Sequence, residues 1–188
     1  MDICGAAALL VVFLPLLLVI GLMIRLESPG AALFRQQRGG LGGRTFVIYK
    51  FRTMRVVQDD ASVSHAVRQD PRVTPLGAFL RRTSIDELPQ LLNVLKGDMS
   101  LVGPRPHALA HDQHYSAHLP EYMDRLQAKP GLTGLAQVSG LRGEIHELDC
   151  MARRVACDIA YIDDWSPLLD IKLLVLTVTR VPFDQRAY

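Results

Sequence analysis

Two adjacent acids, Asp86 and Glu87, follow Arg81 and Arg82 closely, and Arg105 comes after one short apolar stretch. Two carboxylates among arginines suit a site in which one acid attacks a phosphorus atom while the other holds a divalent metal against the phosphate oxygens. The guanidinium groups are suited to binding the same oxygens. This pattern predicts a substrate that is a phosphate ester or anhydride.

The same segment also has a purely structural interpretation. Ser84 is followed three residues later by Glu87, ahead of an apolar run, which is the pattern of a helix capping box. In that interpretation the acids only satisfy the first turn of a helix, and the local pattern alone favours it. Pro89 lacks an N–H and is best tolerated in a first helical turn. Both interpretations therefore place the acids at the start of a helix.

The first segment of the chain is strongly apolar. From Ile3 to Ile24 there is no charged residue over 22 positions, and a helix of that length reaches about 33 Å, close to the thickness of a bilayer core. A cleaved signal peptide fits poorly because Met1-Asp2 supplies no base. Pro15 interrupts the helix. These residues leave open both a helix that crosses the bilayer and one that returns on the same side.

Charge placement predicts the side on which the rest of the chain lies. A run of bases follows the apolar segment and indicates a cytoplasmic location for the remaining chain; these bases are Arg25, Arg35, Arg38, Arg44, Lys50, Arg52 and Arg55. The formal net charge of the 188 residues is only +2. Such a balance argues against a nucleic-acid-binding protein.

Local patterns predict a mainly helical α+β fold. Two β-rich runs around the glycine cluster at 39–43 indicate a small hairpin. The apolar tail suits either an amphipathic helix at a membrane surface or a core helix. The expected hairpin strands are 33–38 and 45–51, the expected helices 77–82, 87–95, 107–127, 144–163 and 165–178, and a loop with one short strand covers 132–140.

Four histidines suggest a different enzyme class. His107, His111, His114 and His118 fall on one face of the expected helix, which raises the alternative of a membrane-associated metal-dependent hydrolase. Four ligands along one straight helix cannot all reach a single ion, because each turn rises by about 5.4 Å. A third alternative is a non-enzymatic membrane scaffold, which should tolerate loss of the Asp86 carboxylate.

Several ordered motifs together resemble one known family across nearly the whole chain. The sequence is similar to the bacterial polyprenyl-phosphate sugar-1-phosphate transferases of the monotopic phosphoglycosyl transferase superfamily. The motifs are Glu27-Ser28-Pro29-Gly30, Phe34-Arg35-Gln36-Gln37-Arg38, Tyr49-Lys50-Phe51-Arg52-Thr53-Met54, the segments 84–90, 97–106 and 129–140, and the 165–172 tail.

The resemblance implies a role for each matching residue. Asp86 would be the nucleophile and would form a covalent aspartyl phospho-sugar, and Glu87 would bind Mg²⁺. Pro15 matches the proline that breaks a re-entrant membrane helix in this family. The resemblance assigns phosphate and substrate binding to four bases, which are Lys50, Arg52, Arg81 and Arg105.

The resemblance also implies partners and location. The expected substrates are a nucleoside diphosphate sugar, with UDP as the guess, and undecaprenyl or another polyprenyl phosphate. Segments 103–108 and 140–144 resemble the branch that starts exopolysaccharide assembly with a hexose-1-phosphate. We expect a re-entrant helix at residues 1–26 and a catalytic domain at 27–188 with interfacial amphipathic helices, on the cytoplasmic face of the bacterial inner membrane. Many relatives of that branch carry an extra multi-helix membrane domain upstream, so this chain is expected to be either a short form or a trimmed one, and a homo-oligomer stays open.

Overall fold

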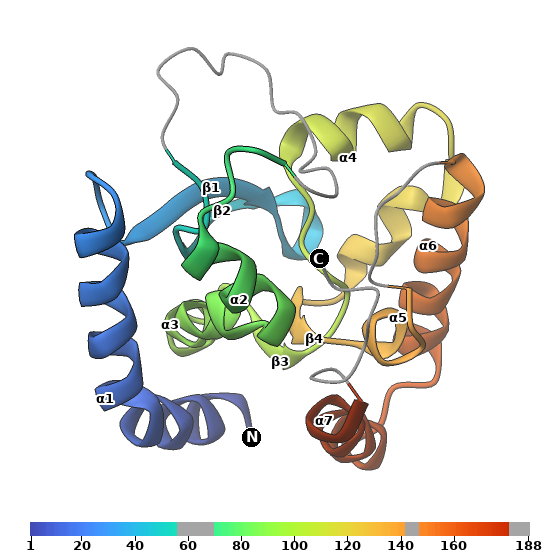
Figure 1. Ribbon diagram of the computed structural model, residues 1–188. Helices are drawn as coiled ribbons and strands as arrows, with labels where there is room; N and C mark the ends of the chain where they lie inside the picture. The colour runs from blue at the N-terminus through green and yellow to red at the C-terminus, as the bar shows by residue number, and fades with distance from the viewer. Residues whose placement is uncertain (56–69, 142–146, 181–188) are drawn as a thin grey trace.

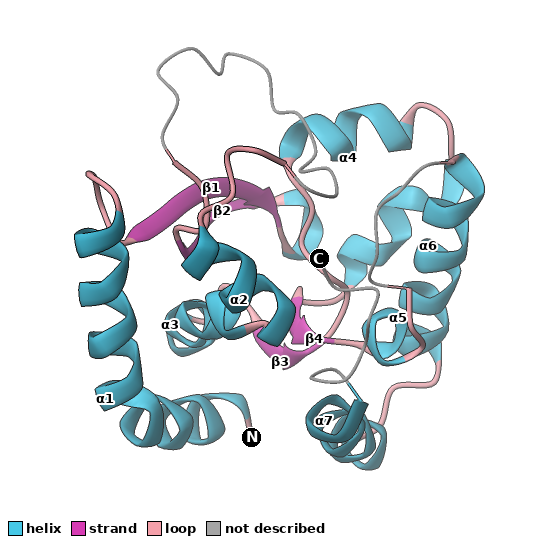
Figure 2. Ribbon diagram, in the orientation of Figure 1, coloured by secondary structure: helices cyan, strands magenta, loops and turns pink. Residues whose placement is uncertain are grey.

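The computed structural model describes residues 1–55, 70–141 and 147–180. Within these residues the fold is mainly helical and contains two small sheets of two strands each (Figure 2). The first helix, α1 (Asp2–Glu27), follows two sides of the domain (Figure 1). The last helix, α7 (Pro167–Arg180), packs into the same apolar cluster as the first turns of α1. The expected mainly helical α+β class is confirmed.

The expected hairpin is present. Strands β1 (Leu33–Gly39) and β2 (Thr45–Phe51) pair antiparallel, and a short 3₁₀ turn, η1 (Leu41–Gly43), joins them. Gly42 and Gly43 have positive φ angles of 63° and 76°, a conformation that favours glycine. Because side chains alternate along a strand, Gln36, Arg38 and Lys50 lie on the same face of the hairpin.

The acid pair follows helix α2 (Pro75–Thr83). The Thr74 side chain accepts a hydrogen bond from Gly77 N at 2.9 Å and starts this helix. The chain then continues as a 3₁₀ helix, η2 (Ile85–Gln90), and as helix α3 (Leu91–Lys96). The single helix expected over 87–95 is therefore two elements. Asn93 joins α3 to β2, because its side chain accepts from Tyr49 N at 3.0 Å and donates to Val47 O at 2.7 Å.

A second, parallel sheet was not predicted. Strands β3 (Ser100–Val102) and β4 (Gly131–Thr133) pair in register, and the short helix α5 (Leu135–Val138) follows. The chain crosses itself very closely here. A Cβ on Gly131 would lie 2.1 Å from Gly103 N, so only glycine fits at this crossing. This contact holds the start of the 103–106 segment.

The helix expected over 107–127 is broken, and that prediction was wrong. Helix α4 (Leu109–Ser116) ends, and a 3₁₀ helix, η3 (Pro120–Gln127), begins after Leu119. Leu119 is extended, with φ −124° and ψ 105°, as expected for a residue that precedes proline. Helix α6 (Leu148–Asp163) follows, and residues 144–146 of its expected range lie outside the described residues.

Helix α1 is bent, and its two halves pack on different parts of the domain (Figure 1). Pro15 lies inside the helix and removes one backbone hydrogen bond. Ala6, in the first half, belongs to the main core with Leu101, whereas Ile24, in the second half, packs with Phe51. One bent helix therefore reaches two separate clusters.

Much of the surface of α1 and α7 is apolar. Within the described residues, α1 alone is long and apolar enough to cross a membrane, and 11% of its most apolar stretch is buried. Leu168, Val175 and Val178 of α7 are exposed as well. The apolar N-terminal helix expected from the sequence is thus present, with most of its side chains directed away from the domain.

Candidate active site

Asp86 and Glu87 are both buried in the first turn of η2, which packs against β2. Their position at the start of a helical element agrees with the sequence. The capping-box interpretation does not hold, since no side chain caps η2 and Ser84 adopts a left-handed conformation with φ 59°. Glu87 instead contacts bases from distant segments.

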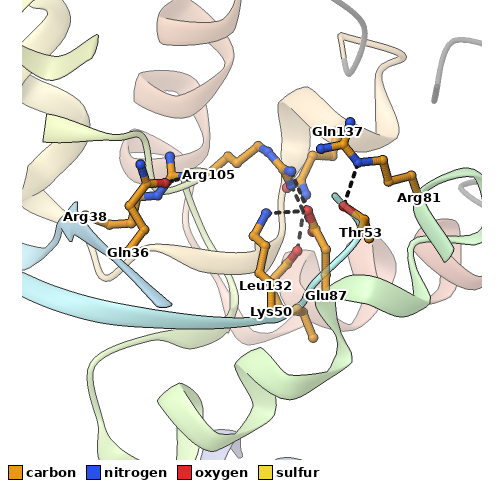
Figure 3. Close-up of polar contacts among 9 residues, drawn as sticks. All are labelled: Gln36, Arg38, Lys50, Thr53, Arg81, Glu87, Arg105, Leu132 and Gln137. Carbon is orange, nitrogen blue, oxygen red and sulfur yellow. Dashed lines mark hydrogen bonds and ion pairs between the residues drawn. The ribbon is translucent and has the colours of Figure 1, made fainter. Parts of the chain in front are cut away.

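Glu87 is bound by two cations (Figure 3). The Lys50 Nζ lies 2.8 Å from its Oε1. Arg105 donates from one guanidinium nitrogen to Oε2 at 3.0 Å and from the other to Oε1. Burial acts to raise the pKa of Glu87, but the charges of Arg105 and Lys50 prevail and hold that pKa well below its ordinary value. Glu87 is therefore an anion near neutral pH.

Asp86 differs from its neighbour. Burial, and then the charge of Glu87, raise the pKa of Asp86 to about 6. Among the described residues, no group donates a hydrogen bond to its carboxylate, whereas both oxygens of Glu87 accept such bonds. A desolvated carboxylate that is free of hydrogen bonds can approach an electrophile. The two acids thus differ: Glu87 is bound by two bases, whereas Asp86 accepts no hydrogen bond from the described residues.

The other two predicted bases have different positions. Arg81 donates from Nε to Thr53 Oγ1 at 2.9 Å (Figure 3). Its charge acts on Asp86. Arg52 does not join the acid pair. Its guanidinium donates to three carbonyls at the end of α1, those of Ile24, Ser28 and Pro29. The structure thus shows Arg52 in contact with the end of α1, and its phosphate contact stays a prediction.

A buried polar network contacts the main chain of Arg105. Arg125 is only 1% exposed; its Nε lies 3.0 Å from Asp158 Oδ2 and its guanidinium 3.1 Å from His107 Nδ1. It also donates to the main-chain carbonyl of Arg105. Sequence reasoning missed Arg125, since nothing in the local pattern of η3 indicates a buried arginine.

The four histidines do not form a metal centre. His107 precedes α4, and its Nδ1 lies 2.7 Å from the Tyr122 hydroxyl in this network. Burial, and then the charge of Arg125, lower the pKa of His107 well below its ordinary value. His118 lies beyond α4 and contacts His114 O through Nδ1 at 2.7 Å. No group of three or more potential ligands occurs in the described parts of the chain, and the hydrolase alternative loses its basis.

Arg38 is a further basic residue near the site that the sequence did not single out. It lies on the same hairpin face as Lys50, and its charge and that of Arg105 act on each other. Its signal is the alternation of the hairpin, which becomes readable only when the register of the two strands is known. The site therefore combines two acids with four bases: Arg38, Lys50, Arg81 and Arg105.

The acid pair fits a magnesium ion that is shared with a phosphate. Mg²⁺ is usually held by one or two carboxylates together with substrate phosphates and waters. Asp86 and Glu87 supply two adjacent carboxylates in one helical turn. Within the described ranges no further acid, histidine or cysteine completes an all-protein cage, so substrate phosphates and waters would supply the remaining ligands of a bound ion.

A buried acid pair facing a cluster of bases, on a domain that carries a long apolar helix, defines a membrane-associated phosphoryl-transfer class. Residues 1–184 match the model of the bacterial sugar transferase family, and the chain belongs to that family. Similar proteins include UDP-glucose:undecaprenyl-phosphate glucose-1-phosphate transferases. The one from Caulobacter vibrioides is 57% identical over the whole chain, which spans 70% of that protein. Those from Escherichia coli and Xanthomonas campestris are 48% and 51% identical over 100% and 93% of the chain, which spans 40% and 36% of their lengths.

Proposed function

We propose that this protein transfers a sugar-1-phosphate from a nucleoside diphosphate sugar to a polyprenyl phosphate. One observation carries the proposal: the two adjacent acids are unequal. Glu87 is held by Lys50 and Arg105, whereas Asp86 accepts no hydrogen bond from the described residues and is available for attack. Membership in the bacterial sugar transferase family supports the same reaction class.

The proposed reaction has two steps. An oxygen of the Asp86 carboxylate bonds to the phosphorus that bears the sugar, and the bond from this phosphorus to the bridging oxygen breaks. The nucleoside monophosphate leaves with that electron pair. An oxygen of the polyprenyl phosphate then attacks the same phosphorus, and the bond to Asp86 breaks to restore the carboxylate. Dividing the transfer in this way replaces one difficult step with two easier ones.

The surrounding bases make the attack feasible. A carboxylate and a phosphate repel each other, so the negative charge that accumulates in the transition state has to be neutralised. Arg105 and Lys50 already converge on Glu87, and both are close enough to act on the charge of Asp86. Arg81 is held in place by Thr53. These three bases are the proposed phosphate contacts.

Magnesium is the proposed cofactor. Glu87, beside Asp86, would hold the ion, and the ion would neutralise phosphate oxygens as a Lewis acid. The contacts that Lys50 and Arg105 make with Glu87 keep this carboxylate ionised, as a metal ligand requires. Because both oxygens of Glu87 accept from these two bases, Lys50 or Arg105 would have to move to the phosphate when the ion binds.

Substrate identity is proposed from the relatives. Those from Caulobacter vibrioides, Escherichia coli and Xanthomonas campestris are named for UDP-glucose and undecaprenyl phosphate. We take the donor to be UDP-glucose, the acceptor undecaprenyl phosphate and the transferred group glucose-1-phosphate. The product, a lipid diphosphate sugar, suits the first step of exopolysaccharide assembly.

The proposed location is the cytoplasmic face of the inner membrane, with α1 as a re-entrant helix. Both ends of α1 bind the same domain: Asp2 Oδ1 accepts from Leu101 N at 3.3 Å, and Arg52 binds carbonyls at the other end. A straight helix of 26 residues would separate its ends by about 39 Å. A bend at Pro15 allows both contacts and supports an anchor that enters and leaves the bilayer on one side.

The test is an assay with the detergent-extracted protein and Mg²⁺. We expect UMP release from UDP-glucose that is sustained only when undecaprenyl phosphate is present, together with formation of the lipid diphosphate glucose. Asp86→Asn should abolish turnover, and Asp124→Asn, which removes an exposed carboxylate outside the site, should keep it. Normal turnover in Asp86→Asn would contradict the assignment and favour a scaffold.

A further inference from the structure

Arg38 is a half-buried base that has no role in the proposed two-step reaction. Its guanidinium donates to the neutral amide oxygen Gln36 Oε1 at 2.6 Å (Figure 3). Its Nε is enclosed and has no hydrogen-bond partner in the described parts of the chain. No carboxylate of the described residues lies within ion-pair distance of Arg38. An enclosed guanidinium donor without a partner is costly, and the positive charge of the group favours an anionic ligand beside it.

The backbone places Arg38 beside the segment that carries Arg105. Its main chain pairs with Ala108, three residues beyond Arg105. Its side chain shares the hairpin face with Lys50. Arg38 is close enough to two other bases for their charges to repel. Burial, and then the charge of Arg105, lower the pKa of Arg38 to about 10. The charge of Arg38 in turn acts to lower the pKa of Lys50. Arg38 stays charged near neutral pH, and the charges of Glu87 and Asp112 offset part of this repulsion.

Basic side chains in the site outnumber acidic ones. Four bases, Arg38, Lys50, Arg81 and Arg105, lie near three acids, Asp86, Glu87 and Asp112, which leaves one more base than acids. Lys50, Arg105 and Arg81 have protein partners at Glu87 and Thr53. Arg38 donates to Gln36, a neutral group, and the nearby charges of Glu87 and Asp112 act on it without forming an ion pair among the described residues. This excess of positive charge attracts an anionic phosphate.

In-line chemistry at one phosphorus atom defines which phosphate this is. When Asp86 attacks, the nucleoside monophosphate leaves from the opposite side of that phosphorus. When the polyprenyl phosphate attacks, it approaches opposite the bond to Asp86 and displaces it. The departing and the entering groups are both phosphate monoesters, and each occupies the position opposite Asp86 in turn. One anion-binding subsite can therefore serve both.

We infer that Arg38, oriented by Gln36, forms the subsite for the phosphate monoester that leaves in the first step and for the one that enters in the second. This inference rests on the proposed function and adds a binding residue to it. It explains how a nucleotide and a lipid that share only a phosphate use the same site. Arg38 binds this phosphate, and Asp86 and Glu87 act on the phosphorus that bears the sugar.

The test compares Arg38→Gln with Arg35→Gln. Arg35 is on the same strand but the opposite face, where it is exposed and lies over the Tyr49 ring. Two constants are measured: half-saturation by UMP in the exchange of labelled UMP into UDP-glucose without acceptor, and half-saturation by undecaprenyl phosphate in the complete reaction. We expect both to rise about tenfold to a hundredfold in Arg38→Gln and neither in Arg35→Gln.

A second measurement uses the unmodified protein and does not depend on the folding of a variant. Phenylglyoxal modification of Arg38, mapped by peptide mass, should be slowed by UMP and equally by undecaprenyl phosphate, while modification of Arg35 should be slowed by neither. Protection by only one of the two ligands, or a rise in only one constant, would overturn the shared subsite. If the wild type releases no UMP from UDP-glucose, the proposed function fails. If the wild type is active and Arg38→Gln behaves like Arg35→Gln, only the shared phosphate subsite is refuted.

Discussion

Arg125 donates a hydrogen bond to the main-chain carbonyl of Arg105, so a buried arginine holds the backbone of the arginine that binds Glu87. The two guanidinium groups have different surroundings. Arg125 is almost fully enclosed, with Asp158 as its counter-charge, whereas the side chain of Arg105 is 35% exposed and reaches the acid pair. The geometry of the active site therefore depends on a polar network behind it.

Removal of Arg125 should destabilise the fold strongly. Arg125→Met leaves the Asp158 carboxylate buried without its partner, and we expect a loss of about 3–5 kcal/mol in the free energy of unfolding. The double variant Arg125→Met/Asp158→Leu should recover a large part of this loss, because no lone charge remains. Urea unfolding in detergent measures both. A double variant that is as unstable as the single one would show that the hydrogen bond to Arg105, and not the ion pair, dominates.

Replacement of Arg105 by lysine should separate charge from geometry. A guanidinium binds both oxygens of Glu87, and one ammonium group cannot reproduce that fork. We expect kcat to fall by about one to three orders of magnitude in Arg105→Lys, with little change in nucleotide-sugar affinity. Arg82→Lys, at an exposed neighbouring position, is the control. Normal turnover in Arg105→Lys would leave Arg105 a structural partner of Glu87 only.

Asp86 should lower the stability of the protein when it ionises. Its pKa is raised from 3.8 to about 6 on folding, chiefly by burial. The folded state therefore keeps Asp86 protonated to a higher pH than the unfolded state does. The contribution of Asp86 to the free energy of unfolding falls as pH rises from about 4 to 6 and then stays low. We expect Asp86→Asn to be more stable than the wild type by about 2–3 kcal/mol at pH 8 and equal to it near pH 4. A destabilised Asp86→Asn at pH 8 would restore the capping interpretation.

The bend in α1 should determine the side on which the N-terminus lies. A cysteine added ahead of Met1, in a variant without the native cysteines, reports access to an impermeant maleimide. We expect labelling only after the cells are opened, and Pro15→Leu should expose a fraction to the outside, because a straight helix can span. Ser139→Cys, on the exposed surface of the domain, is the internal reference. Labelling of the Pro15 protein in intact cells would contradict re-entry.

Elements that form between neighbouring segments of the chain were predicted well from the sequence. The hairpin followed from a glycine cluster between two β-rich runs, and its register brings Lys50 to the acid pair. Leu119 and Pro120 show the limit of helical periodicity, because the extended residue before a proline ended a pattern that otherwise continued. The β3–β4 pairing was invisible, since three-residue strands about 30 positions apart leave no local trace.

The contacts of charged side chains were harder to predict than the elements, for one physical reason. The type of a base shows that it binds anions or carbonyls, but its direction depends on the packing around it. Lys50 and Arg52 are two positions apart, yet Lys50 reaches Glu87 and Arg52 turns to the end of α1. Arg38 and Arg125 were missed because strand register and a buried ion pair become visible only in three dimensions.

The most direct test of the central claim is the intact mass of the protein after incubation with UDP-glucose and Mg²⁺ and without a lipid acceptor. The account predicts a gain equal to one glucose-phosphate group, localised to the peptide that contains Asp86, absent from Asp86→Asn and lost when undecaprenyl phosphate is added. An unchanged mass in a preparation that still transfers glucose-1-phosphate to the lipid would contradict a covalent intermediate on Asp86.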